Sequence, residues 1–169
     1  MLKDIKSNDG GIAIVLLWSI IFFIIMLVST FAIEVYYMNA KAEMVKDAIT
    51  MASLSVYKSI DISELESGEI QIDQDIKDTF EEYLTKNLRL NSDLSARPNS
   101  IVAGEVEVVD FIIYNKSDND ELYPNNQLIY FKPSLYVRIK YDIKPMLRGI
   151  LGNTKTVYTS ATADLIPDK

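Results

Sequence analysis

The chain of 169 residues contains no cysteine and no histidine. These absences exclude disulfides, thiol nucleophiles, imidazole bases and the usual ligands of zinc. An enzyme of this composition would have to pair serine with lysine or use two carboxylates. The sequence holds no Gly-x-Ser-x-Gly, and its "SVYK" (Ser55–Lys58) falls within a predicted helix. We therefore expect a non-catalytic protein without a cofactor or metal, whose folded part is stabilised by its apolar core alone.

Basic residues are also few. The net charge is -7, and the chain after Ile33 holds 15 basic and 22 acidic residues with no cluster of basic side chains. Nucleic acids require a basic surface, so we expect no nucleic-acid partner. The 136 residues after Ile33 suit one domain of ordinary size together with an extended helix.

A long apolar segment lies near the beginning of the sequence. From Ile12 to Ile33, 22 residues follow one another without a charge. As a helix this segment would measure roughly 33 Å, enough to cross a hydrocarbon layer of about 30 Å. The apolar core of a secretory signal peptide is usually only about 7–15 residues long. The sequence therefore predicts a transmembrane helix over residues 12–33, with membrane lipid as its surroundings.

The orientation of this helix follows less directly from charge. Lys3 and Lys6 precede the apolar segment, whereas Lys41 and Lys46 follow it, so the positive-inside count is nearly even. The large acidic C-terminal part favours a short cytoplasmic leader over residues 1–11 and an extracytoplasmic domain. We therefore expect a single-pass protein of the cytoplasmic membrane.

The helical pattern continues beyond the membrane-length segment, over residues 34–60. No Pro or Gly interrupts the chain between Ile12 and Ser59. Apolar residues recur at steps of three and four, as on one face of a helix. We call this set the packing stripe: Met38, Ala42, Val45, Ile49, Ala52, Val56 and Ile60. We expect the chain's own domain to cover it, and a partner helix is the alternative.

The domain expected over residues 61–169 begins with an acidic stretch. Asp61–Glu82 holds nine acidic residues and one lysine, and we interpret it as a solvated surface rather than a cation site. Gly68 and its polar neighbours predict a loop, followed by "EIQI" (Glu69–Ile72) as a short strand. Asp73 is a suitable N-cap for a second helix.

The pattern then changes to alternating β-formers. We predict strands over Glu105–Asn115, Leu128–Ile143 and Thr154–Ile166, with a helical turn or loop before Gly152. Pro133 suggests a bend in the second strand, because proline is confined to sheet edges and bulges. The fold class is therefore α+β: a long N-terminal helix, one half transmembrane and the other amphipathic, packed on a C-terminal antiparallel sheet.

This order of parts resembles that of type IV pilin-like proteins, and more closely that of the TadE/TadG-like proteins of the tight-adherence (Tad/Flp) pilus system. "AIEVYYMNAKAEMVKDAITMASLS" is similar to the segment after the membrane span in that family, and Glu34 matches its acidic position. "VRIKYDIKPMLRGILGNTKTVYTSATADL" is similar to the family's C-terminal end. The resemblance implies a pilin-like fold and a role as a pseudopilin or pilus-assembly protein. It also implies other pilin-like or pilus-assembly proteins as partners of the N-terminal helix.

Gly10 and Gly11 are the candidate processing site that this resemblance implies, with a prepilin peptidase as the partner. In pilins a Glu five residues after the cleavage point neutralises the amine of a neighbouring subunit, because a buried unpaired ammonium would be very costly. Here the fifth residue is Val15 or Leu16, and no acid occurs between Gly11 and Glu34. This departure favours a minor pseudopilin or an unprocessed envelope anchor over the main filament subunit. The alternative is that the Gly pair marks only the start of the span.

The sequence leaves two other functions open and contains two weak site patterns. A single-pass binding or sensor domain and a component of a conjugation apparatus remain alternatives, although residues 1–11 are too few for a cytoplasmic output module. Asp118 and Asp120 alternate as in calcium loops, but the distal Glu of an EF-hand is missing. "NKS" at Asn115 matches an N-glycosylation acceptor, a triplet that often arises by chance.

Overall fold

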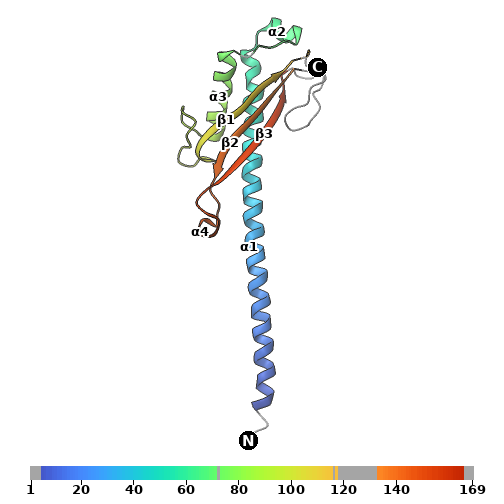
Figure 1. Cartoon of the computed structure of the whole chain (residues 1–169), viewed down its shortest axis with the longest axis vertical. Coiled ribbons are helices and arrows are strands. Elements are labelled where there is room, and N and C mark those ends of the chain that lie inside the picture. Colours follow the sequence, from blue (N-terminus) through green and yellow to red (C-terminus); the bar gives the residue numbers. More distant parts are fainter. Residues whose placement is uncertain (1–4, 72, 116, 118–132, 166–169) are drawn as a thin grey trace. The chain divides into compact units, whose positions relative to one another are not determined.

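The computed structural model describes residues 5–71, 73–115, 117 and 133–165, with side chains from Gly11 onward. In chain order it contains α1, the 3-10 helix η1, α2, α3, β1, β2, α4 and β3 (Figure 1). The chain divides into two compact units, Met1–Tyr37 and Met38–Lys169. The first unit contains only helix among its described residues, whereas the second unit contains the α+β domain.

Helix α1 spans Ile5–Ser55 and is continuous for 51 residues. The absence of proline allows this length, and several hydroxyl groups bond to the backbone of the helix. Ser19 and Thr30 each donate from the side chain to the carbonyl four residues earlier, Val15 and Met26, at 2.8 Å. The backbone then tightens into η1, Val56–Ser59, and becomes extended at Ile60, which ends the helix.

Two further helices follow, and their ends have clear local causes. α2 spans Ile62–Ser67 and stops at Gly68, whose left-handed backbone (φ 74°) lets its N–H donate to the Glu64 carbonyl. α3 spans Gln74–Leu88, and the Asp73 carboxylate accepts a hydrogen bond from the Ile76 N–H at 2.8 Å. The predicted N-cap at Asp73 is thereby confirmed.

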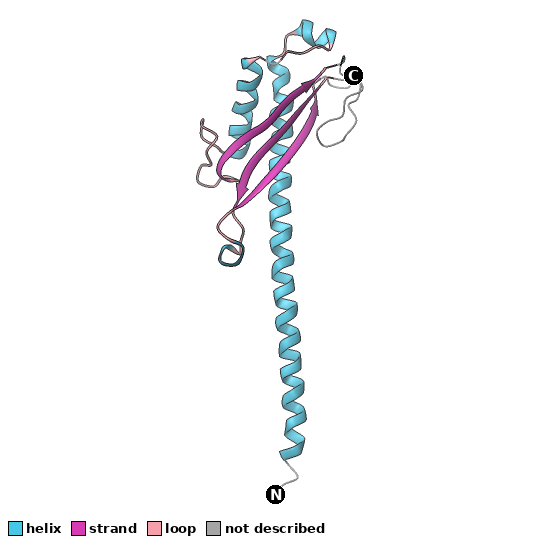
Figure 2. Ribbon diagram, in the orientation of Figure 1, coloured by secondary structure: helices cyan, strands magenta, loops and turns pink. Residues whose placement is uncertain are grey.

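The sheet has three antiparallel strands in the order β1-β2-β3, with β2 in the centre. β1 spans Ala103–Tyr114, β2 spans Ser134–Ile143 and β3 spans Lys155–Asp164. The short helix α4, Arg148–Leu151, lies in the β2–β3 connection. Figure 2 shows the three strands side by side, with α3 and the C-terminal part of α1 on one face of the sheet. These observations confirm the α+β class with an antiparallel sheet.

The core of the domain lies between the sheet and two helices, α1 and α3. Central strand β2 contributes alternate residues from Leu135 to Ile143, and Phe80 of α3 meets Phe111 of β1 edge to face, with ring centroids 5.2 Å apart. The other buried members from α3 share one face, at Ile76, Leu84 and Leu88. Alternation in the strands and a 3.6-residue period in the helix therefore meet in one core.

Three local expectations differ from the structure. Glu69–Gln71 is not a strand, and the preceding loop contains α2, a helix whose short acidic sequence gave no apolar period. The second strand does not run through Pro133, and β2 begins at Ser134 directly after it. Residues 128–132 lie outside the described residues, so that part of the predicted strand and the bend at Pro133 stay predictions.

Candidate functional site: the N-terminal apolar helix

The apolar segment of α1 exposes its side chains all around the helix. Trp18 is 65% exposed, Phe22 is 70% exposed and Ile33 is 59% exposed. Nothing within the described residues of the first unit covers this surface, and none of the residues from Ile12 to Ile33 is charged. A helix that is apolar all round is suited to a nonpolar solvent such as lipid.

The helix from Gly11 onward is long and apolar enough to cross a membrane. Its place near the N-terminus also suits a signal sequence, by the same criterion of length and composition. Its polar side chains do not oppose burial in lipid, since Ser19 and Thr30 already bond to backbone carbonyls of the preceding turn. The backbone and these two hydroxyl groups are therefore hydrogen-bonded within the helix itself, as an apolar solvent requires.

The candidate processing site and the family-matching acid both lie within α1. Gly10 and Gly11 are helical and follow the start of α1 at Ile5, so the Gly pair does not mark the beginning of this helix. A Cβ added at Gly11 would meet nothing within 4 Å. Glu34 is only 3% exposed and has a polar interaction, as expected for an acid that remains in a buried position.

The structure places most of the packing stripe in the core of the domain. Val45, Ile49, Ala52 and Val56 are fully buried, and Ile60 is 7% exposed. Met38 is partly buried against the same core, and Ala42 is half-buried. The sequence predicted one continuous α-helix through the stripe. In the structure the last two residues of the stripe lie outside α1, because Val56 belongs to η1 and Ile60 follows it. The chain's own domain thus covers the stripe.

The opposite side of the same helix is polar or exposed. Met44 and Met51, seven residues apart, are 50% and 62% exposed. Lys41 lies at the edge of the buried stripe, and its Nζ donates to the Ile101 carbonyl at 3.0 Å. This lysine therefore has a structural partner in the domain.

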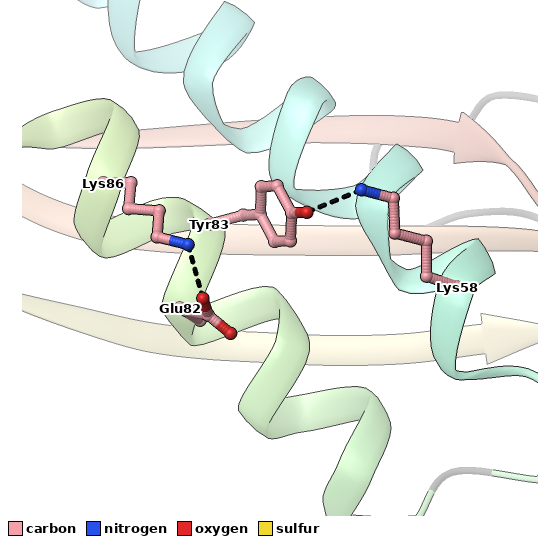
Figure 3. A network of polar contacts seen from close by, with 4 residues as sticks. All are labelled: Lys58, Glu82, Tyr83 and Lys86. Carbon is pink, nitrogen blue, oxygen red and sulfur yellow. Dashed lines mark hydrogen bonds and ion pairs between the residues drawn. The ribbon is translucent and has the colours of Figure 1, made fainter.

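A polar network connects the end of the long helix to α3 (Figure 3). Lys58 Nζ donates to the Tyr83 hydroxyl at 2.6 Å and lies 4.9 Å from the ring centroid. Lys86 lies 5.2 Å from the same ring and pairs with Glu82. The hydrogen bond and the charge of Glu82 raise the pKa of Lys86. The ammonium groups contact the face and the hydroxyl of Tyr83, and this arrangement stabilises the surface of α3.

A pair of hydrogen bonds between Asn115 and Ile70, which we call the Asn115 clamp, was not predicted from the sequence. Asn115 directly follows β1, and its side chain accepts from the Ile70 N–H at 2.7 Å and donates to the Ile70 carbonyl at 3.1 Å. Ser117 adds two bonds to the Glu69 carboxylate, one from its N–H at 3.1 Å and one from its hydroxyl at 2.9 Å. These bonds fix the α2–α3 linker to the end of the strand. The side-chain amide of Asn115 in "NKS" is thus hydrogen-bonded to the backbone of Ile70. The triplet alone does not indicate a hydrogen bond between residues so far apart in the sequence.

The outer face of the sheet carries paired charges. Arg138 Nε lies 2.6 Å from Asp110 Oδ2, and Lys140 Nζ lies 2.7 Å from Glu107 Oε2. The bond and charge of Glu107 raise the pKa of Lys140. Such partly exposed pairs contribute little stability, typically about 0–1 kcal/mol for pairs at the surface. They are cross-strand pairs of β1 and β2 rather than parts of a reaction centre.

The acidic stretch does not assemble a metal site within the described part of the chain, where no group of three potential ligands occurs. The calcium candidates Asp118 and Asp120 lie outside the described residues. Comparisons of the chain with protein-family models, with curated proteins and with solved structures found no match.

Proposed function

We propose that this chain is a membrane-anchored, non-catalytic structural component of a Tad or type IV-like pilus, or of a related secretion machine. One observation carries the proposal. A single continuous helix, α1, supplies a membrane-length segment that is apolar on every side and then a stripe that is buried in an α+β domain. The resemblance of the sequence around Glu34 to TadE/TadG-like proteins supplies the choice of machine.

The helix surface supports association with other apolar helices in the membrane. Small residues occur at Ala13, Ser19, Ser29 and Ala32, and small side chains let helix backbones approach closely in lipid. The partners in this proposal are therefore pilin-like or pilus-assembly proteins that present apolar helices of their own. The C-terminal domain is placed on the extracytoplasmic side.

The assignment as a minor pseudopilin or assembly protein follows from a missing charge. No carboxylate occurs from Ile12 to Ile33, so a new N-terminus after Gly10 or Gly11 would have no acid in the apolar segment of a neighbouring copy. An ammonium buried without a partner costs several kcal/mol. Filaments built mainly from this chain are therefore disfavoured, whereas a single copy or a small number remains compatible with the proposal.

Deletion of the gene in its own host tests the proposal. Surface filaments, or the transport that they support, should be lost or strongly reduced, and a plasmid copy should restore them. Purified filaments should contain the chain rarely or not at all. Normal filaments and transport in the deletion strain would contradict the proposed function. A chain that is the most abundant filament subunit would contradict the minor role.

A further inference from the structure

The outer edge of β3 is long and regular. Ten consecutive residues of β3 pair with β2 without a register shift, from Lys155↔Ile143 to Asp164↔Ser134. Among the described residues no strand lies on the other side of β3. The segment between Lys155 and Asp164 contains no charge, Pro or Gly. Its second row of backbone donors and acceptors is therefore suited to pair with another strand.

The opposite edge of the sheet is protected in several ways. The Ala96 N–H donates to the Gly104 carbonyl at 2.7 Å, and the Val106 N–H donates to the Leu94 carbonyl at 3.1 Å. Val109 is an extra residue in the ladder between β1 and β2. Covering segments and bulges are the usual means by which proteins prevent edge pairing. The domain thus protects the β1 edge and leaves the β3 edge regular.

We propose that the outer edge of β3 is a docking site for an extended strand of a different protein. The interaction would be β-strand addition, in which backbone hydrogen bonds supply affinity and alternate side chains supply specificity. Thr156 and Tyr158 of β3 are exposed, so the outer face of an added strand would meet hydroxyl groups and one aromatic ring.

A second copy of this chain does not fit the outer edge of β3. This conclusion rests on the membrane anchoring of α1 proposed above. Antiparallel pairing of two β3 strands requires a two-fold axis perpendicular to the sheet. The α1 segment from Met38 packs across that sheet. Rotation about the axis therefore also reverses the direction of α1 in the second copy. Copies anchored in one membrane enter their domains in the same direction. Parallel pairing of β3 with the β1 edge of another copy is opposed by the protection of β1.

Charge specifies one end of the added strand. Lys144, Arg148 and Lys155 are exposed around the β2–β3 connection, and no acidic residue occurs between Asp142 and Asp164. The β3 residues between Lys155 and Asp164, which would pair with the added strand, are neutral. The complementary strand is therefore neutral and β-branched along most of its length, with carboxylates at the end beside Lys155.

Synthetic peptides provide the probe. Each of four peptides would contain eight alternating Val and Thr residues. Two of them would carry a pair of Glu, one peptide at its N-terminus and the other at its C-terminus, and the other two would carry a pair of Lys at the same places. Binding to the full chain in detergent micelles would be measured by fluorescence anisotropy. One Glu-terminated peptide should bind at least tenfold more tightly than its Lys-terminated counterpart. Lys155→Glu should reverse that preference, whereas Lys77→Glu on α3 should leave it unchanged.

Backbone pairing is tested with N-methylated versions of the best peptide. Methylating one alternate set of amides should abolish binding, while methylating the other set should preserve it, because only one row of amides faces β3. Equal loss from both sets, no binding by any peptide, or self-association of the full chain through β3 would overturn the proposal. These outcomes do not depend on filaments, so they are separate from the test of the proposed function.

Discussion

The two parts of α1 use one secondary structure for two different surroundings. Between Ile12 and Ile33 every described side chain is apolar or hydroxylic and the large ones are exposed. After Met38 only one stripe is apolar and buried, while the other faces carry charge. The distribution of apolar residues around a helix, rather than the helix itself, therefore indicates whether lipid or protein covers it.

The largest expected effect comes from placing a charge in the buried stripe. Ile49→Asp should destabilise the domain by several kcal/mol and abolish cooperative unfolding, because a carboxylate without a partner would enter the core. Met51→Asp, on the exposed side of the same helix turn, is the matched control and should shift the melting temperature only slightly. Thermal unfolding of the full chain in detergent micelles would measure both. Equal effects would contradict the assignment of the two faces.

A charge in the first part of α1 should produce the opposite pattern. The double substitution Ile20→Asp and Ile24→Asp should reduce membrane retention strongly, since each aspartate at the centre of a span costs about 2.5–3.5 kcal/mol. The domain should keep its melting temperature. Alkaline extraction of membranes would measure retention, and Ile20→Val with Ile24→Val is the control. Unchanged retention of the aspartate variant would show that this segment does not span.

Loss of the Asn115 clamp should have an intermediate effect. Asn115→Ala removes both hydrogen bonds to the backbone of Ile70 and should destabilise the domain by about 1–3 kcal/mol. Asn153→Ala, at an exposed residue in the β2–β3 connection, should change stability by less than about 0.5 kcal/mol. Chemical denaturation would compare the two variants. A neutral Asn115→Ala would show that the linker does not need the clamp.

The smallest expected effect appears at alkaline pH. Burial raises the pKa of Tyr141, although a 2.7 Å hydrogen bond with Thr159 opposes the shift. The unfolded chain loses this proton near pH 10, whereas the folded chain keeps it. Stability from Tyr141 is therefore fully present below pH 10 and decreases as the pH rises towards the folded pKa. Tyr141→Phe should flatten that decrease, and Tyr158→Phe should not. Parallel curves for Tyr141→Phe and the unmodified chain would contradict the shift.

Periodic patterns predicted the main elements because each repeats a local rule. The alternation of Val, Ile and Tyr located the described parts of β1, β2 and β3 to within a few residues. The N-cap Asp73 also followed from local sequence. In contrast, α2 is short and lacks an apolar face, and the Asn115–Ile70 clamp joins residues 45 positions apart. Neither produces a periodic pattern in the sequence, so both could be found only in the structure.

Single-cysteine labelling tests the central claim, one membrane crossing with the domain outside, most directly. Because the chain has no cysteine, Ser7→Cys before the span and Asn153→Cys in the domain each introduce a unique thiol. A membrane-impermeant maleimide on intact protoplasts should label Asn153→Cys at once and Ser7→Cys only after lysis. Ile49→Cys, which is buried, should react only after denaturation. Labelling of Ser7→Cys but not Asn153→Cys in intact protoplasts would reverse the topology and contradict the account.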